Sequence, residues 1–111
     1  GAYYNRGNAK HALKDYYGAI GDFNKAIEIN PSYDSAYNNR GYAKHNLEDY
    51  YGAISDYTKS NAINPNSYSY YFMAKAKKKI GDMKGACADW RKVYSFGYET
   101  GALKLVRKFC Q

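Results

Sequence analysis

At 111 residues the chain is long enough for one domain with a continuous core that needs neither a metal nor a disulfide to fold. Its net charge of +7 comes entirely from residues 66–111, which carry ten basic and three acidic residues, whereas residues 1–65 carry seven of each. No apolar run approaches the roughly 20 residues that span a bilayer, and the first residues lack the apolar core of a signal peptide. We therefore expect no membrane span or signal peptide in this sequence. The compartment stays open, with a cytoplasmic location favoured.

An internal repeat dominates the sequence. Residues 2–31 align with residues 36–65 at an offset of 34, and 20 of the 30 aligned pairs are identical. Pro31 and Pro65 follow Asn at matching positions, where the Asn-Pro pair closes one unit and turns into the next. Such a period is typical of units that cannot bury a hydrophobic face alone and stack on copies of themselves. The sequence therefore predicts a stacked surface and not a catalytic pocket.

The first unit, residues 2–35, contains two segments in which small and apolar residues recur with a helical period. The first segment is marked by Tyr3, Gly7, Ala9 and Leu13. The second is marked by Tyr16, Ala19, Ile20, Phe23, Ala26 and Ile27. Asp15 lies in the turn between them and is a candidate N-cap for the second helix. Because Gly inside a helix costs up to about 1 kcal/mol relative to Ala, the recurrence of glycine at Gly7 and Gly41, and at Gly18 and Gly52, predicts a close approach of the two helices of each unit.

The second and third units follow the same plan. Residues 36–68 repeat the first unit closely, and residues 69–95 form a degenerate third unit that begins one residue early. In the third unit Trp90 stands at the position of Phe23. Residues 99–110 place Leu103, Val106 and Cys110 on one stripe, so we predict a capping helix that covers the last repeat.

These residues carry a resemblance to a known family. A 34-residue helix–turn–helix unit with an aromatic residue, Gly, Ala, Phe or Tyr, Ala and Pro at these places resembles the tetratricopeptide repeat (TPR), over residues 2–95. The NRGxAK and GAIxDF/Y patterns and the GACADWRK ending are similar to TPR proteins abundant in bacteria, cyanobacteria among them. The resemblance implies an all-α fold: one domain, an α-solenoid of three units plus a C-terminal capping helix. It also implies a concave groove, lined mainly by first helices, that binds peptides, and no general catalytic activity.

The chain departs from the simple TPR pattern at Arg6 and Arg40, where the family more often has an apolar residue. Each arginine recurs with an acid sixteen residues later, and these acids are Asp22 and Asp56. We therefore predict that an Arg–Asp pair ties together the two helices of each of these units. In the third unit Met73 replaces the arginine while Asp89 remains, so we predict that the pair is lost there.

The groove positions of the family map onto one set of residues in each unit. These are Tyr4, Asn5, Asn8 and His11, then Asn38, Asn39, Tyr42 and His45, then Tyr71, Phe72, Lys75 and Lys78. Asn side chains can hold the amides of an extended peptide, Tyr adds flat contact area at low entropic cost, and Lys attracts a carboxylate. Binding is the favoured interpretation of the groove as a whole. For any single residue, the exposed polar face of a solenoid remains the simpler interpretation.

One TPR subclass grips the acidic C-terminal tails of heat-shock chaperones with a clamp of two Asn and three basic residues. Asn8 and Asn39 occupy the two Asn positions, whereas the basic positions hold Tyr4, Tyr68 and Phe72. Every positive charge of the clamp is missing, which argues against that ligand. The lysines of the third unit could still hold an acidic peptide in a different geometry.

The histidines and cysteines give two further expectations. His11 and His45 are one repeat position seen twice and do not have a metal-ligand spacing, so we predict no metal site and no cofactor. If the capping helix folds back antiparallel about Gly97, the distances of Cys87 and Cys110 from that turn, measured along the helices, differ by only about 4.5 Å. A disulfide is then feasible in an oxidising compartment. Two small buried side chains that pack the cap are the favoured alternative.

The leading functional hypothesis is a non-enzymatic protein–protein interaction module with a bias towards acidic ligands at its C-terminal end. The alternative is self-association through the first helix, which has no capping segment before it and exposes its outer face. Nucleic-acid binding by the basic third unit and cap ranks lower, because the two best-formed units are neutral. An enzyme ranks last, since the sequence has no Gly-rich phosphate loop and no nucleophile paired with a base. The identity of the partner and the cellular process do not follow from the sequence.

Overall fold

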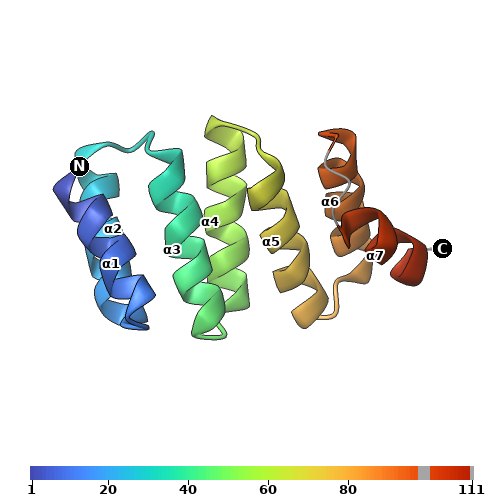
Figure 1. Cartoon of the computed structure of the whole chain (residues 1–111), viewed down its shortest axis with the longest axis horizontal. Helices are drawn as coiled ribbons and strands as arrows, with labels where there is room; N and C mark the ends of the chain where they lie inside the picture. Colours follow the sequence, from blue (N-terminus) through green and yellow to red (C-terminus); the bar gives the residue numbers. More distant parts are fainter. Residues whose placement is uncertain (98–100, 111) are drawn as a thin grey trace.

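The computed structural model describes residues 1–97 and 101–110. Within these residues the chain forms seven α-helices and no strand, so the predicted all-α class is confirmed. The helices are α1 (Ala2–Ala12), α2 (Tyr16–Ile29), α3 (Asp34–Asn46), α4 (Tyr50–Ile63), α5 (Ser67–Lys79), α6 (Met83–Ser95) and α7 (Gly101–Phe109). They follow one another along the long axis of a molecule that measures 43 × 24 × 19 Å, with the termini at opposite ends (Figure 1).

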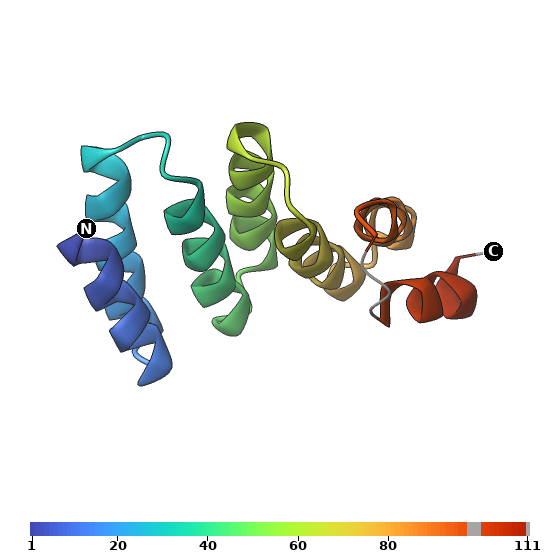
Figure 2. The same cartoon turned by 45° about the horizontal axis from the view of Figure 1, so that its top comes forward.

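The first six helices form three hairpins that stack in chain order. Within the hairpins α1 packs on α2, α3 on α4 and α5 on α6, and the contacts of α2 with α3 and of α4 with α5 join neighbouring hairpins. The helix axes turn progressively along this stack (Figure 2). The predicted α-solenoid of three units with a capping helix is therefore confirmed. The first helices of the second and third units begin at Asp34 and Ser67, two residues before the predicted unit starts, and residues 99–100 of the predicted cap lie outside the described residues.

The core repeats because each unit buries a large ring at the same position. Phe23, Tyr57 and Trp90 are almost completely buried, each on the second helix of its unit. The first helix comes close to the ring: a Cβ atom added to Gly7 would lie 2.7 Å from Phe23 Cε1, and one added to Gly41 would lie 3.1 Å from Tyr57 Cε1. The close approach predicted from the helical glycines is confirmed at these two positions.

The turn inside each unit ends in an aspartate that caps the second helix. The capping residues Asp15, Asp49 and Asp82 accept hydrogen bonds of 3.0, 3.0 and 2.9 Å from the backbone amide three residues later. A Cβ atom on Gly18 or Gly52 would collide with the capping carboxylate of its own turn. These two glycines make room for the aspartate that caps the N-terminus of the second helix. The prediction that Gly18 marks a close approach of helices is therefore wrong.

A buried aspartate joins the two helices of the first unit. Arg6 donates from Nε and Nη2 to the two oxygens of Asp22 at 2.8 and 2.7 Å, and Lys10 Nζ lies 3.2 Å from the same carboxylate. The second unit repeats the arrangement with Arg40, Lys44 and Asp56. Bidentate arginine–carboxylate bonds are among the stronger polar contacts in proteins. We call each set of three residues a charge cluster.

The third unit keeps part of this cluster. Lys77 Nζ lies 2.8 Å from Asp89 Oδ2, although Met73 has replaced the arginine. Lys77 is four residues after Met73 and therefore lies on the same face of α5. With Met73 in place of the arginine, the third unit has no Arg–Asp pair, but the pairing of Asp89 with Lys77 was not foreseen, because the prediction considered the arginine position alone.

The capping helix α7 covers the C-terminal end of the stack. A disulfide joins Cys87 of α6 to Cys110, which directly follows α7, and the two Cα atoms are 5.7 Å apart. Of the two alternatives left open by the sequence, the structure has the disulfide and not the favoured pair of unbonded cysteines. Leu105 and Phe109 pack against the cluster around Trp90. A covalent bond and an apolar contact therefore both hold α7 in place.

Candidate peptide-binding groove

A polar pocket lies on the first helices of the three units. We call it the asparagine pocket; it has a volume of about 210 Å³ and is lined by Asn8, His11, Asn39, Tyr42 and Tyr68. Asn39 Nδ2 donates hydrogen bonds to Asn8 Oδ1 at 2.8 Å and to the hydroxyl of Tyr4 at 3.0 Å. These bonds join α3 to α1 and fix the orientation of both asparagine amides.

Four rings run across the same region from α1 to α5. The ring centroids of His11 and Tyr42 are 4.8 Å apart, those of Tyr42 and Phe72 are 5.1 Å apart, and those of Phe72 and Tyr68 are 4.5 Å apart. Ring pairs at such distances add to the stabilisation from burial alone. Tyr42 is the central ring, since it is the one that joins α1 to α5.

A larger, basic pocket lies where the third unit meets the cap. We call it the lysine pocket; it has a volume of about 400 Å³ and is lined by His45, Tyr71, Lys75, Lys78, Lys79, Trp90 and Leu105. Lys78 Nζ lies 4.1 Å from the ring centroid of Phe109, and Lys75 Nζ lies 5.5 Å from that of Tyr71. The groove prediction missed Trp90 and Leu105 because the family map covers first helices only and reads Trp90 as core, and it also missed Lys79, which lies on the first helix α5.

The two pockets contain eight of the twelve predicted groove residues, and the four that lie outside both are Tyr4, Asn5, Asn38 and Phe72. Asn5 is exposed on α1. Asn38 Oδ1 accepts a 2.8 Å hydrogen bond from Ser69 Oγ, so its side chain joins α3 to α5. The repeat position of Asn38 predicts a ligand contact, whereas the structure gives its amide oxygen a partner in the next unit.

Comparison of the chain with models of protein families identifies a family. Two models described as tetratricopeptide repeat match residues 1–33 and residues 23–55. The chain belongs to the tetratricopeptide repeat family. No curated protein sequence is significantly similar to the chain.

Solved TPR domains share the fold over nearly the whole chain. The OM64 TPR domain of Arabidopsis is 26% identical, with 96% of this chain and 89% of that chain covered and a TM-score of 0.90. The Sgt2 TPR domain of Aspergillus fumigatus is 25% identical, with coverage of 93% and 70% and a TM-score of 0.85. The first TPR of Spaghetti (RPAP3), bound to the HSP90 peptide SRMEEVD, is 22% identical, with coverage of 97% and 87% and a TM-score of 0.92.

The five clamp positions named from the TPR resemblance lie around the asparagine pocket. Asn8 and Asn39 are bonded to each other there, and the hydroxyl of Tyr4 accepts a second bond from Asn39. Tyr68 and Phe72 form the end of the row of rings. Uncharged aromatic side chains therefore stand at the three basic positions of the clamp.

The two histidines of the TPR groove favour their neutral form. Burial lowers the pKa of His11. Burial also lowers the pKa of His45, and the nearby charges of Lys75 and Lys79 lower it further. The positive charge of the lysine pocket is therefore carried by its lysines at neutral pH.

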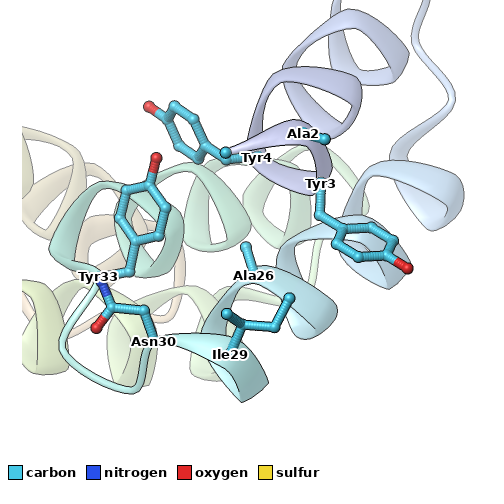
Figure 3. A pocket seen from close by; sticks show the side chains of 8 residues that line it. Ala2, Tyr3, Tyr4, Ala26, Ile29, Asn30 and Tyr33 are labelled. Carbon is cyan, nitrogen blue, oxygen red and sulfur yellow. The ribbon is translucent and has the colours of Figure 1, made fainter.

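A third pocket opens at the N-terminal end of the TPR stack and is shown in Figure 3. It has a volume of about 190 Å³ and is lined by Gly1, Ala2, Tyr3, Tyr4, Ala26, Ile29, Asn30 and Tyr33. The rings of Tyr4 and Tyr33 lie side by side, 4.8 Å apart, while Tyr3 points away from them. No charged side chain lines this pocket among the described residues, so its surface suits an apolar contact better than an ionic one.

Two further properties concern the part of the chain that the structure describes. No helix in it is both long and apolar enough to cross a membrane. No three His, Cys, Asp or Glu side chains in it lie close enough together to hold a metal ion.

Proposed function

We propose that this TPR domain is a non-enzymatic interaction module that binds an extended peptide segment along the first helices of its three units. The observation that carries the proposal is the adjacency of the asparagine and lysine pockets on these helices. Tyr42 and His45 are three residues apart on α3, and Tyr68 and Tyr71 are three residues apart on α5. Residues at this spacing lie on one face of a helix, so the two pockets adjoin.

The chemistry of the two pockets suggests how a peptide lies in the groove. The asparagine pocket offers uncharged amide and hydroxyl groups, which suit the backbone of an extended chain. The lysine pocket offers three ammonium groups, which suit an acidic segment. We therefore propose that the acidic part of the ligand lies towards α7.

A structural neighbour supports this class of ligand. The first TPR of Spaghetti is bound to the peptide SRMEEVD, which contains Glu and Asp. At 22% identity the likeness shows the fold alone. It supports the view that a stack of this shape can hold an acidic peptide, while the aromatic residues at the clamp positions argue for a different mode of binding here.

Affinity capture from a lysate of the source organism tests the proposal, with wild type beside two variants. Tyr42→Ala removes the central ring of the groove, and Tyr51→Ala removes a tyrosine of α4 that is 72% exposed, which makes it a matched control. We expect a protein that wild type and Tyr51→Ala capture and Tyr42→Ala does not, with equal helicity by circular dichroism. A partner retained by folded Tyr42→Ala would contradict the proposed groove. Identical sets of captured proteins for wild type and the two variants would contradict it as well.

Self-association is a second candidate, favoured by the exposed face of α1. The Arg6 side chain is 60% exposed, whereas that of Arg40 is 14% exposed, and Asn24 of α2 accepts a bond from Arg40 Nη1. Within the described residues no helix covers α1 as α2 covers α3. We rank this candidate second because α7 already covers the far end of the stack, which prevents head-to-tail stacking of copies. A monomer by light scattering at high concentration would exclude it.

Nucleic-acid binding ranks third. The first two units are neutral, and two of their five lysines, Lys10 and Lys44, are engaged with aspartates. One lysine of the basic third unit, Lys77, is also paired internally. No RNA binding at low salt would exclude this candidate, because phosphate contacts are strongest there.

A further inference from the structure

The lysine pocket is built by four helices. α3 contributes His45, α5 contributes Tyr71 and the three lysines, α6 contributes Trp90 and α7 contributes Leu105. The three lysines have no ion-pair partner among the described residues. Each ammonium group has three hydrogen-bond donors and no acceptor, so the pocket offers an excess of donors.

Trp90, which has a buried hydrogen-bond donor, lines the same pocket. Trp90 is 1% exposed, and its indole Nε1 has no hydrogen-bond partner among the described residues. Leaving a buried N–H group without a partner is costly, and such groups are rare in folded proteins. Trp90 is also the single tryptophan of the chain, so the one indole N–H signal comes from a residue of this pocket.

The walls between these groups are apolar. The rings of Tyr71 and Trp90 and the side chain of Leu105 line the pocket beside the lysines. Lys75 and Lys78 lie against aromatic rings, which holds their ammonium groups near the pocket. A matching ligand group therefore combines hydrogen-bond acceptors, negative charge and a short apolar part.

We infer that the lysine pocket binds a carboxylate of the peptide ligand, with Trp90 Nε1 and the ammonium groups of Lys78 and Lys79 as donors and with an apolar residue of the peptide against Leu105. An ionised carboxylate accepts hydrogen bonds and donates none, which complements a site made of donors. The inference rests on the proposed function and assigns the acidic end of the ligand to this pocket. The carboxylate can belong to a Glu side chain or to the C-terminus of the peptide.

The test uses a synthetic acetylated peptide, Gly-Ser-Gly-Glu-Leu-Glu, in three forms. The free acid carries side-chain and terminal carboxylates, the C-terminal amide keeps only the side-chain ones, and an amidated Gln-Leu-Gln form has none. Binding is followed through the indole N–H signal of Trp90 in a nitrogen–proton correlation spectrum. We expect the free acid to shift this signal and the Gln form to leave it unchanged. The amide form shows which carboxylate is bound.

Two double variants locate the site. Lys78→Ala/Lys79→Ala removes two lysines of the pocket, and we expect it to weaken binding of the free acid about tenfold. Lys84→Ala/Lys92→Ala removes the same charge from exposed positions of α6 outside the pocket, and we expect less than about a twofold change, because distant surface charges are screened. Trp90→Phe keeps an aromatic core residue and removes the donor, so labelled peptide should bind it about fivefold more weakly.

The outcomes separate this inference from the proposed function. If the indole signal does not move, or if both double variants weaken binding equally, the inference is wrong. If at the same time Tyr42→Ala still abolishes capture of a cellular partner, the proposed groove stands. If the free acid shifts the indole signal but Tyr42→Ala captures every partner that wild type does, the carboxylate site stands and the groove fails.

Discussion

In the first two units an aspartate of the second helix binds both an arginine and a lysine of the first helix, whereas the third unit has the lysine alone. Asp22 and Asp56 each accept two hydrogen bonds from a guanidinium group, and Asp89 has Lys77 as its ion-pair partner. The pKa values of Asp22 and Asp89 are shifted in opposite directions. The hydrogen bond from Arg6 lowers the pKa of Asp22 to about 2, whereas burial raises the pKa of Asp89.

The third unit has other means of holding its helices. Trp90 fills its core, the ring of Phe109 stacks 5.9 Å away, and the Cys87–Cys110 disulfide ties the cap to α6. Buried charge pairs specify geometry but stabilise little when both charges lose their water. Apolar packing and a covalent link avoid that desolvation cost. The stack therefore changes from charge clusters to apolar packing towards its C-terminal end.

This change determines where positive charge is available. Lys10 and Lys44 are engaged with aspartates inside their units, whereas Lys75, Lys78 and Lys79 have no such partner among the described residues. The net charge of +7 originates in residues 66–111. The comparison teaches that one fold can engage lysines of two units in internal ion pairs and leave three lysines of the third unit without an ion-pair partner among the described residues.

The largest expected effect comes from neutralising the buried aspartate of one unit. Asp56→Asn leaves Arg40 and Lys44 beside an uncharged amide, which we expect to lower the free energy of unfolding by about 3 to 5 kcal/mol. Asp89→Asn, its counterpart in the third unit, replaces a carboxylate that burial already disfavours, so we expect a loss of about 1 kcal/mol. Denaturant unfolding of both variants measures the two losses. Equal losses would show that the units depend on their aspartates to the same extent.

The second effect concerns the cap. The disulfide links residues separated by 23 positions, and closing a loop of this size stabilises a fold by about 3 kcal/mol. Reduction should therefore speed amide hydrogen exchange in α7 while leaving α1 to α4 unchanged. Hydrogen-exchange mass spectrometry with and without reductant measures this. The Cys87→Ala/Cys110→Ala variant is the control, since its exchange should not respond to reductant. Slow exchange in α7 after reduction would show that the apolar contacts alone hold the helix on the stack.

Repetition in the sequence made much of the fold predictable. Gly7 and Gly41 recur at one position, so their shared role at the helix contact follows from comparing the two copies. Gly18 recurs equally well, but its role depends on the capping carboxylate of Asp15, and repetition alone does not distinguish a cap from a helix contact. The repeat locates special positions, whereas the local geometry decides what they do.

The site was predictable only where it follows the repeat. Asn39 and Tyr42 occupy the groove side of a first helix and line the asparagine pocket. The lysine pocket also needs Trp90 and Leu105, and Leu105 arrives there because α7 folds back on α6. That placement depends on how the cap packs, for which the repeat supplies no second copy to compare. Lysines are also so common on exposed helix faces that Lys79 gives no signal of its own.

The smallest expected effect is on the response of stability to acid. The pKa of Asp22 is lowered from 3.8 to about 2 in the folded state, so the unfolded state binds a proton more readily. This stabilisation is fully present above the unfolded pKa and is lost as the pH falls from about 4 towards 2. Asp22→Asn should therefore flatten the loss of stability in that window, as measured by denaturant midpoints at successive pH values.

Asp89 should respond with the opposite sign. Its pKa is raised in the folded state, so the folded protein binds a proton more readily than the unfolded one, and protonation of Asp89 adds stability as the pH falls through the raised value. Asp89→Asn removes this gain, so its stability should fall more steeply with acid than that of wild type. If both variants flattened the acid response, the two aspartates would be stabilised alike, and the contrast between charge clusters and apolar packing would not extend to their carboxylates.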